Sequence, residues 1–145
     1  MEYKPSNPKD SVGIKKVPFS TVPSEVTAEV GLAMLEGALK YGRHNYRSVG
    51  VRASVYYDAA LRHLTSFWEG QDTDPDSGLP HLVKCLACLY VLRDSQHMGN
   101  WVDDRPPVFP DKDDWILKLN RLAETLVGKY PEPAKTYTEK EIDDA

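Results

Sequence analysis

The sequence predicts an all-α protein, a bundle of four to five helices, and three observations lead to this fold class. Apolar residues recur three and four positions apart over long segments, which is the period of an amphipathic helix. These segments are separated by stretches rich in Gly, Pro and Asp, which are typical of loops. No segment shows the strict alternation expected of a half-buried strand. The length of 145 residues suits one domain with a real core.

The N-terminal part is expected to be an extended arm, because residues 1–23 are rich in Pro, Lys, Ser and Asn. The first helix is predicted from a cap at Ser24 to about Tyr41, where Gly42 ends it. A loop is expected over residues 42–52. The second helix then runs from a cap at Ser54 to about Trp68.

The third predicted helix is strongly apolar and is expected to be central. It follows the loop of residues 70–80, with a cap at Ser77, and covers about residues 79–94. After a second loop at 99–110, a fourth helix begins at Asp111 or Asp113 and ends at Gly128. We therefore expect one domain over residues 1–130, arm included, and a polar, flexible tail over residues 131–145.

Composition excludes several classes of function. The formal net charge is −4, which argues against a general binder of nucleic acid or of anionic membranes. We see no apolar run long enough for a bilayer and no signal peptide at the start, so we expect a cytoplasmic protein. Two cysteines, Cys85 and Cys88, make no disulfide framework, and core packing is expected for both.

The most informative pattern is a charged stripe on the first helix, formed by Glu29, Glu36 and Lys40 with apolar residues on both sides. Burying a carboxylate is costly unless a cation or metal pairs with it. Asp58 on the second helix can meet Glu36 across a groove. Oxygen ligands on facing helices suit Mg²⁺ or Mn²⁺. We expect Glu36 and Asp58 to be catalytic and Glu29, Glu36 and Asp58 to bind metal, although Asp58 and Arg62 also fit a surface ion pair.

Cations and polar groups near the turn between these helices suit a phosphorylated substrate. Phosphate contacts are expected from Lys40 and Arg62. Tyr41, Asn45 and Arg47 are expected to bind phosphate, sugar or a neighbouring protomer. Gly13 and Lys15 of the N-terminal arm are expected to close over the base. The candidate substrate-binding residues are Gly13, Lys15, Lys40, Tyr41, Asn45, Arg47 and Arg62. The alternative is an ordinary solvated basic loop.

Two histidines and an acidic loop remain open. His63 and His81 fit general bases, ligands or packing residues, of which packing is the commonest. The acids of the loop at Asp72, Asp74 and Asp76 lack the spacing and terminal Glu of an EF-hand. They are expected either to assist a metal site or to be solvated.

A family resemblance adds to these expectations. The runs NPKDSVG, LEGALKYGRHNYR, SVYYDAALRHLTSFWEGQDTD and SGLPHL, in this order, resemble the phage dATP/dGTP diphosphohydrolases, the MazG-like group called MazZ. The resemblance covers residues 7–94. It implies an all-α NTP pyrophosphohydrolase fold, usually oligomeric, which cleaves a deoxypurine triphosphate between the α and β phosphates with Mg²⁺ or Mn²⁺. In phages with 2-aminoadenine in their DNA, such enzymes are thought to supply dGMP and deplete dATP.

The chain departs from the family's E-x-x-E and E-x-x-D motifs. Leu39 and Val55 occupy two acid positions, and Gln71 stands where relatives often have Glu. Missing ligands would have to come from Glu29, Glu69 or the loop acids. Three alternatives therefore stay open: a pyrimidine or dUTP hydrolase on the same fold, a helical module that binds nucleotide without hydrolysis, and a helical adaptor. Helices apolar on several sides favour a homo-oligomer, dimer or tetramer.

Overall fold

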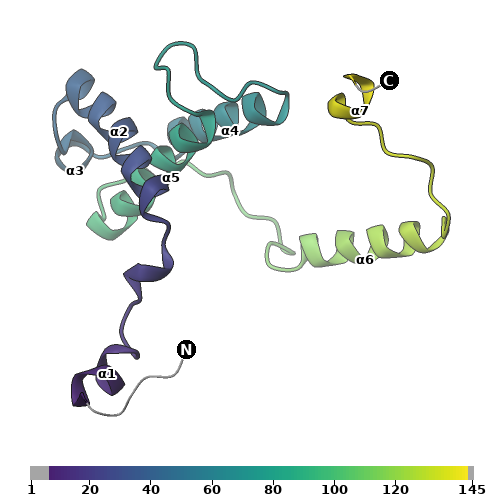
Figure 1. Cartoon of the computed structure of the whole chain (residues 1–145), viewed down its shortest axis with the longest axis horizontal. Coiled ribbons are helices and arrows are strands. Elements are labelled where there is room, and N and C mark those ends of the chain that lie inside the picture. The colour runs from purple at the N-terminus through teal and green to yellow at the C-terminus, as the bar shows by residue number, and fades with distance from the viewer. Residues whose placement is uncertain (1–6, 144–145) are drawn as a thin grey trace. The chain divides into compact units, whose positions relative to one another are not determined.

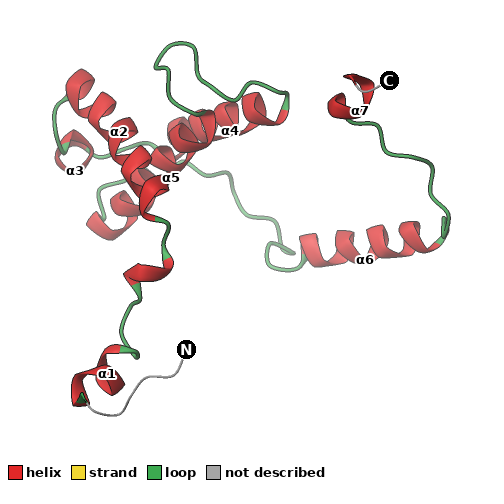
Figure 2. Ribbon diagram, in the orientation of Figure 1, coloured by secondary structure: helices red, strands yellow, loops and turns green. Residues whose placement is uncertain are grey.

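The computed structural model describes residues 7–143, and all regular elements within that range are helices (Figures 1 and 2), which confirms the all-α prediction. The chain divides into two compact units, one up to Arg105 and one from Pro106. We expected residues 1–130 to fold as a single domain, and this stays a prediction. The helices of the described part include none that is long and apolar enough to cross a membrane.

The first unit contains most of the helical structure. Its elements are α1 (Pro8–Gly13), a 3₁₀ turn (Phe19–Thr21), α2 (Ser24–Tyr41), α3 (Asn45–Val49), α4 (Ala53–Trp68) and α5 (His81–Met98). The predicted ends at Tyr41 and Trp68 are confirmed, and Gly42 follows α2 with a φ of 95°, a conformation that favours glycine. Two short helices were not predicted, α1 within the arm and α3 within the expected loop.

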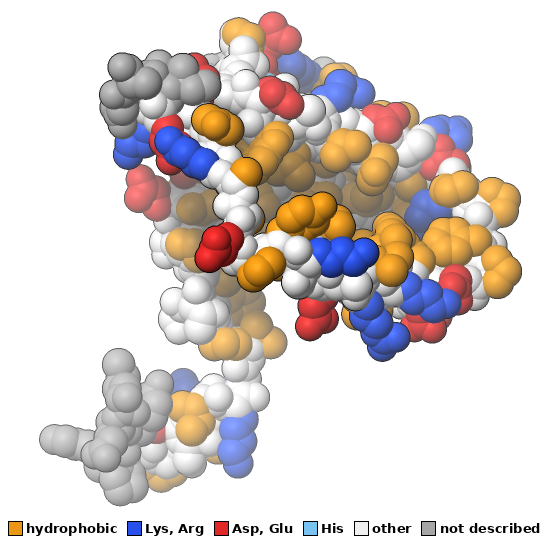
Figure 3. Space-filling model, turned by 90° about the vertical axis from the view of Figure 1, so that its right-hand side faces the viewer, with side chains coloured by type: hydrophobic (Ala, Val, Ile, Leu, Met, Phe, Trp, Pro, Cys, Tyr) orange, Lys and Arg blue, Asp and Glu red, His pale blue; other side chains and the backbone are white. Residues whose placement is uncertain are grey.

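Helix α5 is central, as its apolar sequence predicted, since it packs against α2, α3 and α4. A small core joins Val30 and Ala33 of α2 to Val83 of α5, each less than a tenth exposed. Small residues at the contact allow the helices to approach closely. The other faces of these helices carry many exposed apolar side chains. Figure 3 shows that apolar side chains are also numerous on the side of the molecule that it presents.

The start of α4 is fixed by a distant segment rather than by its own serine. The predicted cap, Ser54, lies inside the first turn, and its backbone N–H donates to Asp104 Oδ1 at 2.8 Å. The Ala53 N–H donates to the Val102 carbonyl at 3.0 Å. Asp104 therefore accepts from a helical N–H that has no partner within the helix, as a capping carboxylate does. At α5 the start shifts the other way, because the helix was predicted from about Leu79 with a cap at Ser77 and begins instead after Pro80.

The second unit holds α6 (Trp115–Gly128) and α7 (Glu139–Asp143). Helix α6 has the predicted end at Gly128 and the predicted apolar face, whose members are all exposed: Trp115, Leu119, Leu122 and Leu126. Helix α7 lies within residues 131–145, which were expected to form a polar, flexible tail.

Candidate active site

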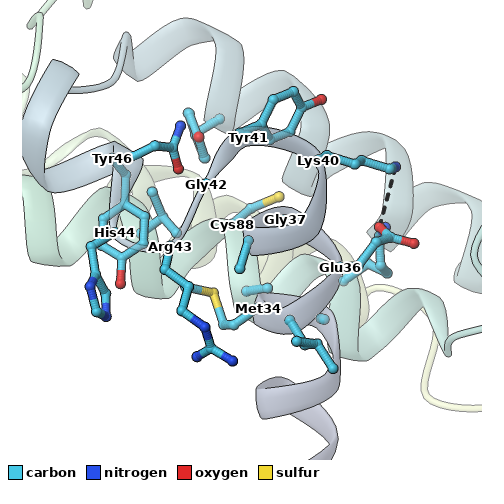
Figure 4. A pocket seen from close by; sticks show the side chains of 18 of the residues that line it. Met34, Glu36, Gly37, Lys40, Tyr41, Gly42, Arg43, His44, Tyr46 and Cys88 are labelled. Atoms are coloured by element: carbon cyan, nitrogen blue, oxygen red, sulfur yellow. Dashed lines mark hydrogen bonds and ion pairs between the residues drawn. The ribbon is translucent and has the colours of Figure 1, made fainter.

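One cavity of about 600 Å³ lies in the first unit, between α2, α3, α4 and α5. This size falls within the usual range for small-molecule sites. The C-terminal half of α2 and the turn after it supply more of the wall than any other segment. Residues with polar groups on the wall are Glu36, Lys40, Tyr41, Arg43, His44, Asn45, Tyr46, Tyr56, His63, Lys84 and Cys88. Figure 4 shows the cavity with Glu36 and Lys40 at one end and His44 and Tyr46 at the other.

The charged end is organised by Lys84 of α5. Its ammonium donates a hydrogen bond to Glu36 Oε1 and lies 3.8 Å from Asp74 Oδ2. Lys40 Nζ lies 3.5 Å from the same Glu36 oxygen. The hydrogen bond from Lys84 is the main reason that the pKa of Glu36 lies below its ordinary value. Glu36 is therefore ionised at neutral pH and held by two ammonium groups, which are also suitable partners for phosphate oxygens.

The other end of the cavity is built by the turn between α2 and α3 and by α3 itself. His44 adopts a left-handed backbone conformation, with a φ of 62°, which lets α3 begin directly after the turn. The Asn100 side-chain amide donates to the Tyr46 carbonyl at 3.3 Å and the Arg47 carbonyl at 2.8 Å, so α3 is held from outside. Tyr46 and His44 offer flat surfaces for stacking, and Asn45 offers donors and acceptors.

A chain of hydrogen bonds runs into the cavity wall from the loop before α5. Gln71 Oε1 lies 2.7 Å from His81 Nε2, and His81 Nδ1 lies 2.9 Å from His63 Nδ1. His81 is only 4% exposed. The loop is ordered by Asp74, whose carboxylate accepts from the Asp76 N–H at 3.0 Å and from Ser77 Oγ at 3.1 Å. The acidic loop thus serves in part to position the histidines.

The structure brings together some of the predicted site residues and not others. Four line the cavity: Glu36, Lys40, Tyr41 and Asn45. Six do not: Gly13, Lys15, Glu29, Arg47, Asp58 and Arg62. Arg47 instead makes two hydrogen bonds to Asp94, at 3.0 and 2.8 Å. Asp58 is exposed, and no ion pair joins it to Arg62 in the described chain.

Sequence reasoning missed Lys84 and left His63 undecided. Lys84 is the one charged residue in the apolar stretch 82–92 of α5, and a lone charge at such a position is a usable signal of a buried partner. The signal for His63 was weaker, since a histidine on a helix is common in packing roles. The cysteine interpretation agrees with the structure, because both thiols are free and burial raises the pKa of Cys85.

The expected metal ligands do not form a set within this chain. Among residues 7–143, His, Cys, Asp and Glu side chains nowhere gather in groups of three that would suit a metal ion. Glu36 is the one carboxylate on the cavity wall, and its partners are lysines. Mg²⁺ usually keeps several waters and uses few carboxylates together with substrate phosphates, but the donors in this chain do not by themselves fit a resident ion.

Comparison with known proteins identifies the family. The family model described as dATP/dGTP diphosphohydrolase, N-terminal, matches residues 6–105. A dATP/dGTP diphosphohydrolase of Salmonella phage PMBT28 is 30% identical over 77 residues, which are 53% of this chain and 26% of that protein. The match thus spans about a quarter of the length of this relative. No solved structure matches significantly. The match covers α1 to α5 and the whole cavity, and the chain therefore belongs to the dATP/dGTP diphosphohydrolase N-terminal family.

Proposed function

We propose that this chain hydrolyses dATP and dGTP to the deoxynucleoside monophosphate and pyrophosphate, by cleavage between the α and β phosphates. The observation that carries the proposal is the cavity, which has two ammonium groups at one end and aromatic side chains at the other. A nucleoside triphosphate has the same division, with its charge at one end and a flat base at the other. The family of the chain supports the choice of deoxypurine substrates.

In this proposal the triphosphate lies against Lys40 and Lys84, whose charges offset those of the phosphate oxygens. The base lies toward His44 and Tyr46, where stacking accepts either purine. Asn45 lines the same part of the wall and is suited to hydrogen bonds with sugar or base. Such an arrangement fixes the α phosphorus near Glu36 and His63 by holding both ends of the substrate.

A requirement for Mg²⁺ or Mn²⁺ is part of the proposal. When bound, such an ion neutralises phosphate charge and polarises the reacting phosphoryl group. The metal requirement is supported by the chemistry of the substrate and by the sequence resemblance. The predicted ligands Glu29, Glu36 and Asp58 do not add support, because they are not brought together here. Glu36 is the carboxylate nearest to the expected phosphates and is the first residue to test as a ligand.

The test is analysis of products from the purified full chain with each of the four dNTPs, in Mg²⁺, Mn²⁺ or EDTA. We expect dGMP and dAMP with pyrophosphate in the presence of metal, and little product from dCTP or dTTP. Release of inorganic phosphate with dNDP would contradict α–β cleavage. Equal turnover of dUTP or of the pyrimidine substrates would contradict the purine preference.

A second candidate is a nucleotide-binding module that does not hydrolyse by itself. The observation that favours it is the unassembled set of predicted metal ligands. A binder stabilises the folded state in proportion to ligand occupancy, so this candidate predicts a nucleotide-dependent rise in melting temperature without any product. A chain that shows neither change would favour a helical adaptor instead.

We further propose that the chain works as a homo-oligomer. Large apolar side chains are exposed on α2, α4 and α6, and include Leu39, Trp68 and Leu122. Exposed apolar surface of this extent is typical of an interface. A second copy is also the simplest source of the ligands that one chain does not gather. Sedimentation of the full chain would give the mass of the assembly, and a monomer would contradict this part of the proposal.

The wider role that we propose is in phage nucleotide metabolism, in the host cytoplasm. There the reaction would supply dGMP and lower dATP for a genome containing 2-aminoadenine. The support is the sequence resemblance together with the phage source of the relative. Nucleoside analysis of DNA replicated from the genome that encodes this chain would test this role. Unmodified adenine throughout that DNA would contradict it.

A further inference from the structure

The relay of Gln71, His81 and His63 has a direction that can be worked out from its hydrogen bonds. Gln71 Oε1 is a carbonyl oxygen and can only accept, so His81 Nε2 carries the proton of the 2.7 Å contact. In a neutral imidazole the second nitrogen then has no proton. His81 Nδ1 therefore accepts, and His63 Nδ1 donates across 2.9 Å.

This direction fixes the state of His63. With its proton on Nδ1, neutral His63 has a free electron pair on Nε2. His63 lies on the cavity wall, together with Glu36 and Lys84. The relay enters the ring through Nδ1, from the side of His81, so Nε2 is the nitrogen left to meet a molecule in the cavity.

The surroundings keep His63 neutral. Burial is the main reason that the pKa of His63 lies below its ordinary value. The charged and titratable groups that act on it are Asp74 of the loop, His81 and Lys84 of α5, and Arg62 of its own helix. Asp74 favours the protonated ring, whereas the other three oppose it. An acceptor nitrogen is therefore present beside the cations expected to hold phosphate.

We propose that His63 is the general base of the reaction and that His81 and Gln71 are positioning residues which set its tautomer. This inference rests on the proposed function. His63 Nε2 takes a proton from water, and the water oxygen forms a bond to the α phosphorus. The bond from that phosphorus to the bridging oxygen breaks, and pyrophosphate leaves with the electron pair. The imidazolium returns its proton to solvent, and its Nδ1–H stays bonded to His81.

Position 71 offers a sharp test of the direction of the relay. A carboxylate can only accept hydrogen bonds, so Gln71→Glu preserves the direction, whereas Gln71→Met removes the acceptor. We expect Gln71→Met to lower kcat about tenfold or more and Gln71→Glu to retain most of the wild-type kcat. A merely structural role for Gln71 predicts instead that Met and Glu lower kcat together with the melting temperature.

The base itself is tested with His63→Gln and His63→Asn, measured as kcat and KM from pH 5 to pH 9. A positioned general base contributes roughly 10²- to 10⁴-fold, so we expect kcat to fall at least ~100-fold with little change in KM. Protonation of His63 should make the wild-type kcat fall toward acid pH, and this fall should be absent in both His63 variants. His97→Gln, at an exposed histidine of α5 outside the cavity, is the matched control and should behave as wild type. An unchanged kcat and pH profile in both His63 variants would overturn the proposal.

The tautomer can be read without any turnover. Imidazole ¹⁵N chemical shifts of the full chain at pH 7 should show His63 protonated at Nδ1 alone and His81 at Nε2 alone. The opposite tautomers, or a doubly protonated His63, would overturn the relay. Wild-type protein that binds dGTP without hydrolysing it would contradict the proposed function and the base role together, whereas active protein with unaffected His63 variants would contradict the base role only.

Discussion

Arg47 and Asp94 are joined by two hydrogen bonds, of 3.0 Å from Nε and 2.8 Å from Nη2, which fasten α3 to the second half of α5. Each partner moves the pKa of the other away from its ordinary value, upward for Arg47 and downward for Asp94. The pair is a fork of the kind that Arg forms well and Lys does not. Arg47, which the sequence suggested as a substrate contact, thus has a structural partner.

Breaking this pair should affect folding rather than substrate binding. We expect Arg47→Ala and Asp94→Ala each to lower the melting temperature slightly, with little change in KM for dGTP, because neither residue lines the cavity. The double variant should be no less stable than the worse single variant, since both remove the same interaction. Arg43→Ala is the contrasting variant: Arg43 lines the cavity and should raise KM with an unchanged melting temperature.

Gly50 is expected to tolerate no side chain. Its φ is 78°, and a Cβ atom there would lie 2.1 Å from the Asn100 carbonyl oxygen. Gly50→Ala should therefore destabilise the fold by more than about 1 kcal/mol, measured by urea unfolding. Gly31→Ala in the middle of α2 is the matched control. A Cβ at Gly31 meets nothing within 4 Å, so it should leave stability unchanged or raise it by about 0.5–1 kcal/mol.

The cap at the start of α4 predicts a specific acid sensitivity. The Ser54 hydroxyl and N–H donate to Asp104 and lower its pKa below the ordinary 3.8. A carboxyl group with a depressed folded pKa stabilises the protein above its unfolded pKa, and that contribution is lost as pH falls through the folded pKa. We expect Asp104→Asn to lessen the loss of stability below about pH 4.

The same unfolding series checks the cause of this sensitivity. Ser54→Ala removes the hydroxyl donor, so it should lower stability at neutral pH and weaken the acid dependence. In the Asp104→Asn background, Ser54→Ala should have a smaller effect, because the two groups act on one another. Full additivity of the two changes would show that the cap does not couple them.

Glu36 provides the most direct test of the cavity as the site of reaction. We expect Glu36→Gln to lower kcat for dGTP by at least ~100-fold while the protein stays folded, since Gln keeps the size but not the charge. The rise in melting temperature on adding dGTP should persist, because Lys40 and Lys84 remain to hold the phosphates. Near-normal turnover would exclude a catalytic role for Glu36, and Glu25→Gln, outside the cavity, serves as the control.

Local signals in the sequence were sufficient for the long helices. The apolar period predicted α2, α4 and α5, and Gly42 and Gly128 marked two ends. The short helix α3 could not be predicted, because its stabilising contact is with Asn100, more than fifty residues away. The start of α4 likewise depends on Asp104. Such contacts between distant segments leave no periodic pattern.

The candidate site was only partly predictable for a related reason. Glu29 and Glu36 share a helical stripe, but the cavity begins at Gly31, so only Glu36 reaches it. Helical spacing identifies residues on a common face without showing how far along the helix that face is covered. The partner of Glu36, Lys84, comes from α5, and nothing in the spacing of α2 points to it.

Lys84 stands between the carboxylates of Glu36 and Asp74, so these two acids act as its counter-ions. A triphosphate arriving at this end competes with Glu36 for the same ammonium group. Counter-ion exchange would then release the Glu36 carboxylate when substrate anions take its place. On the proposed function, Glu36 and the substrate would compete for Lys84, and raising the ionic strength should weaken both the Lys84–Glu36 pair and its replacement by phosphate.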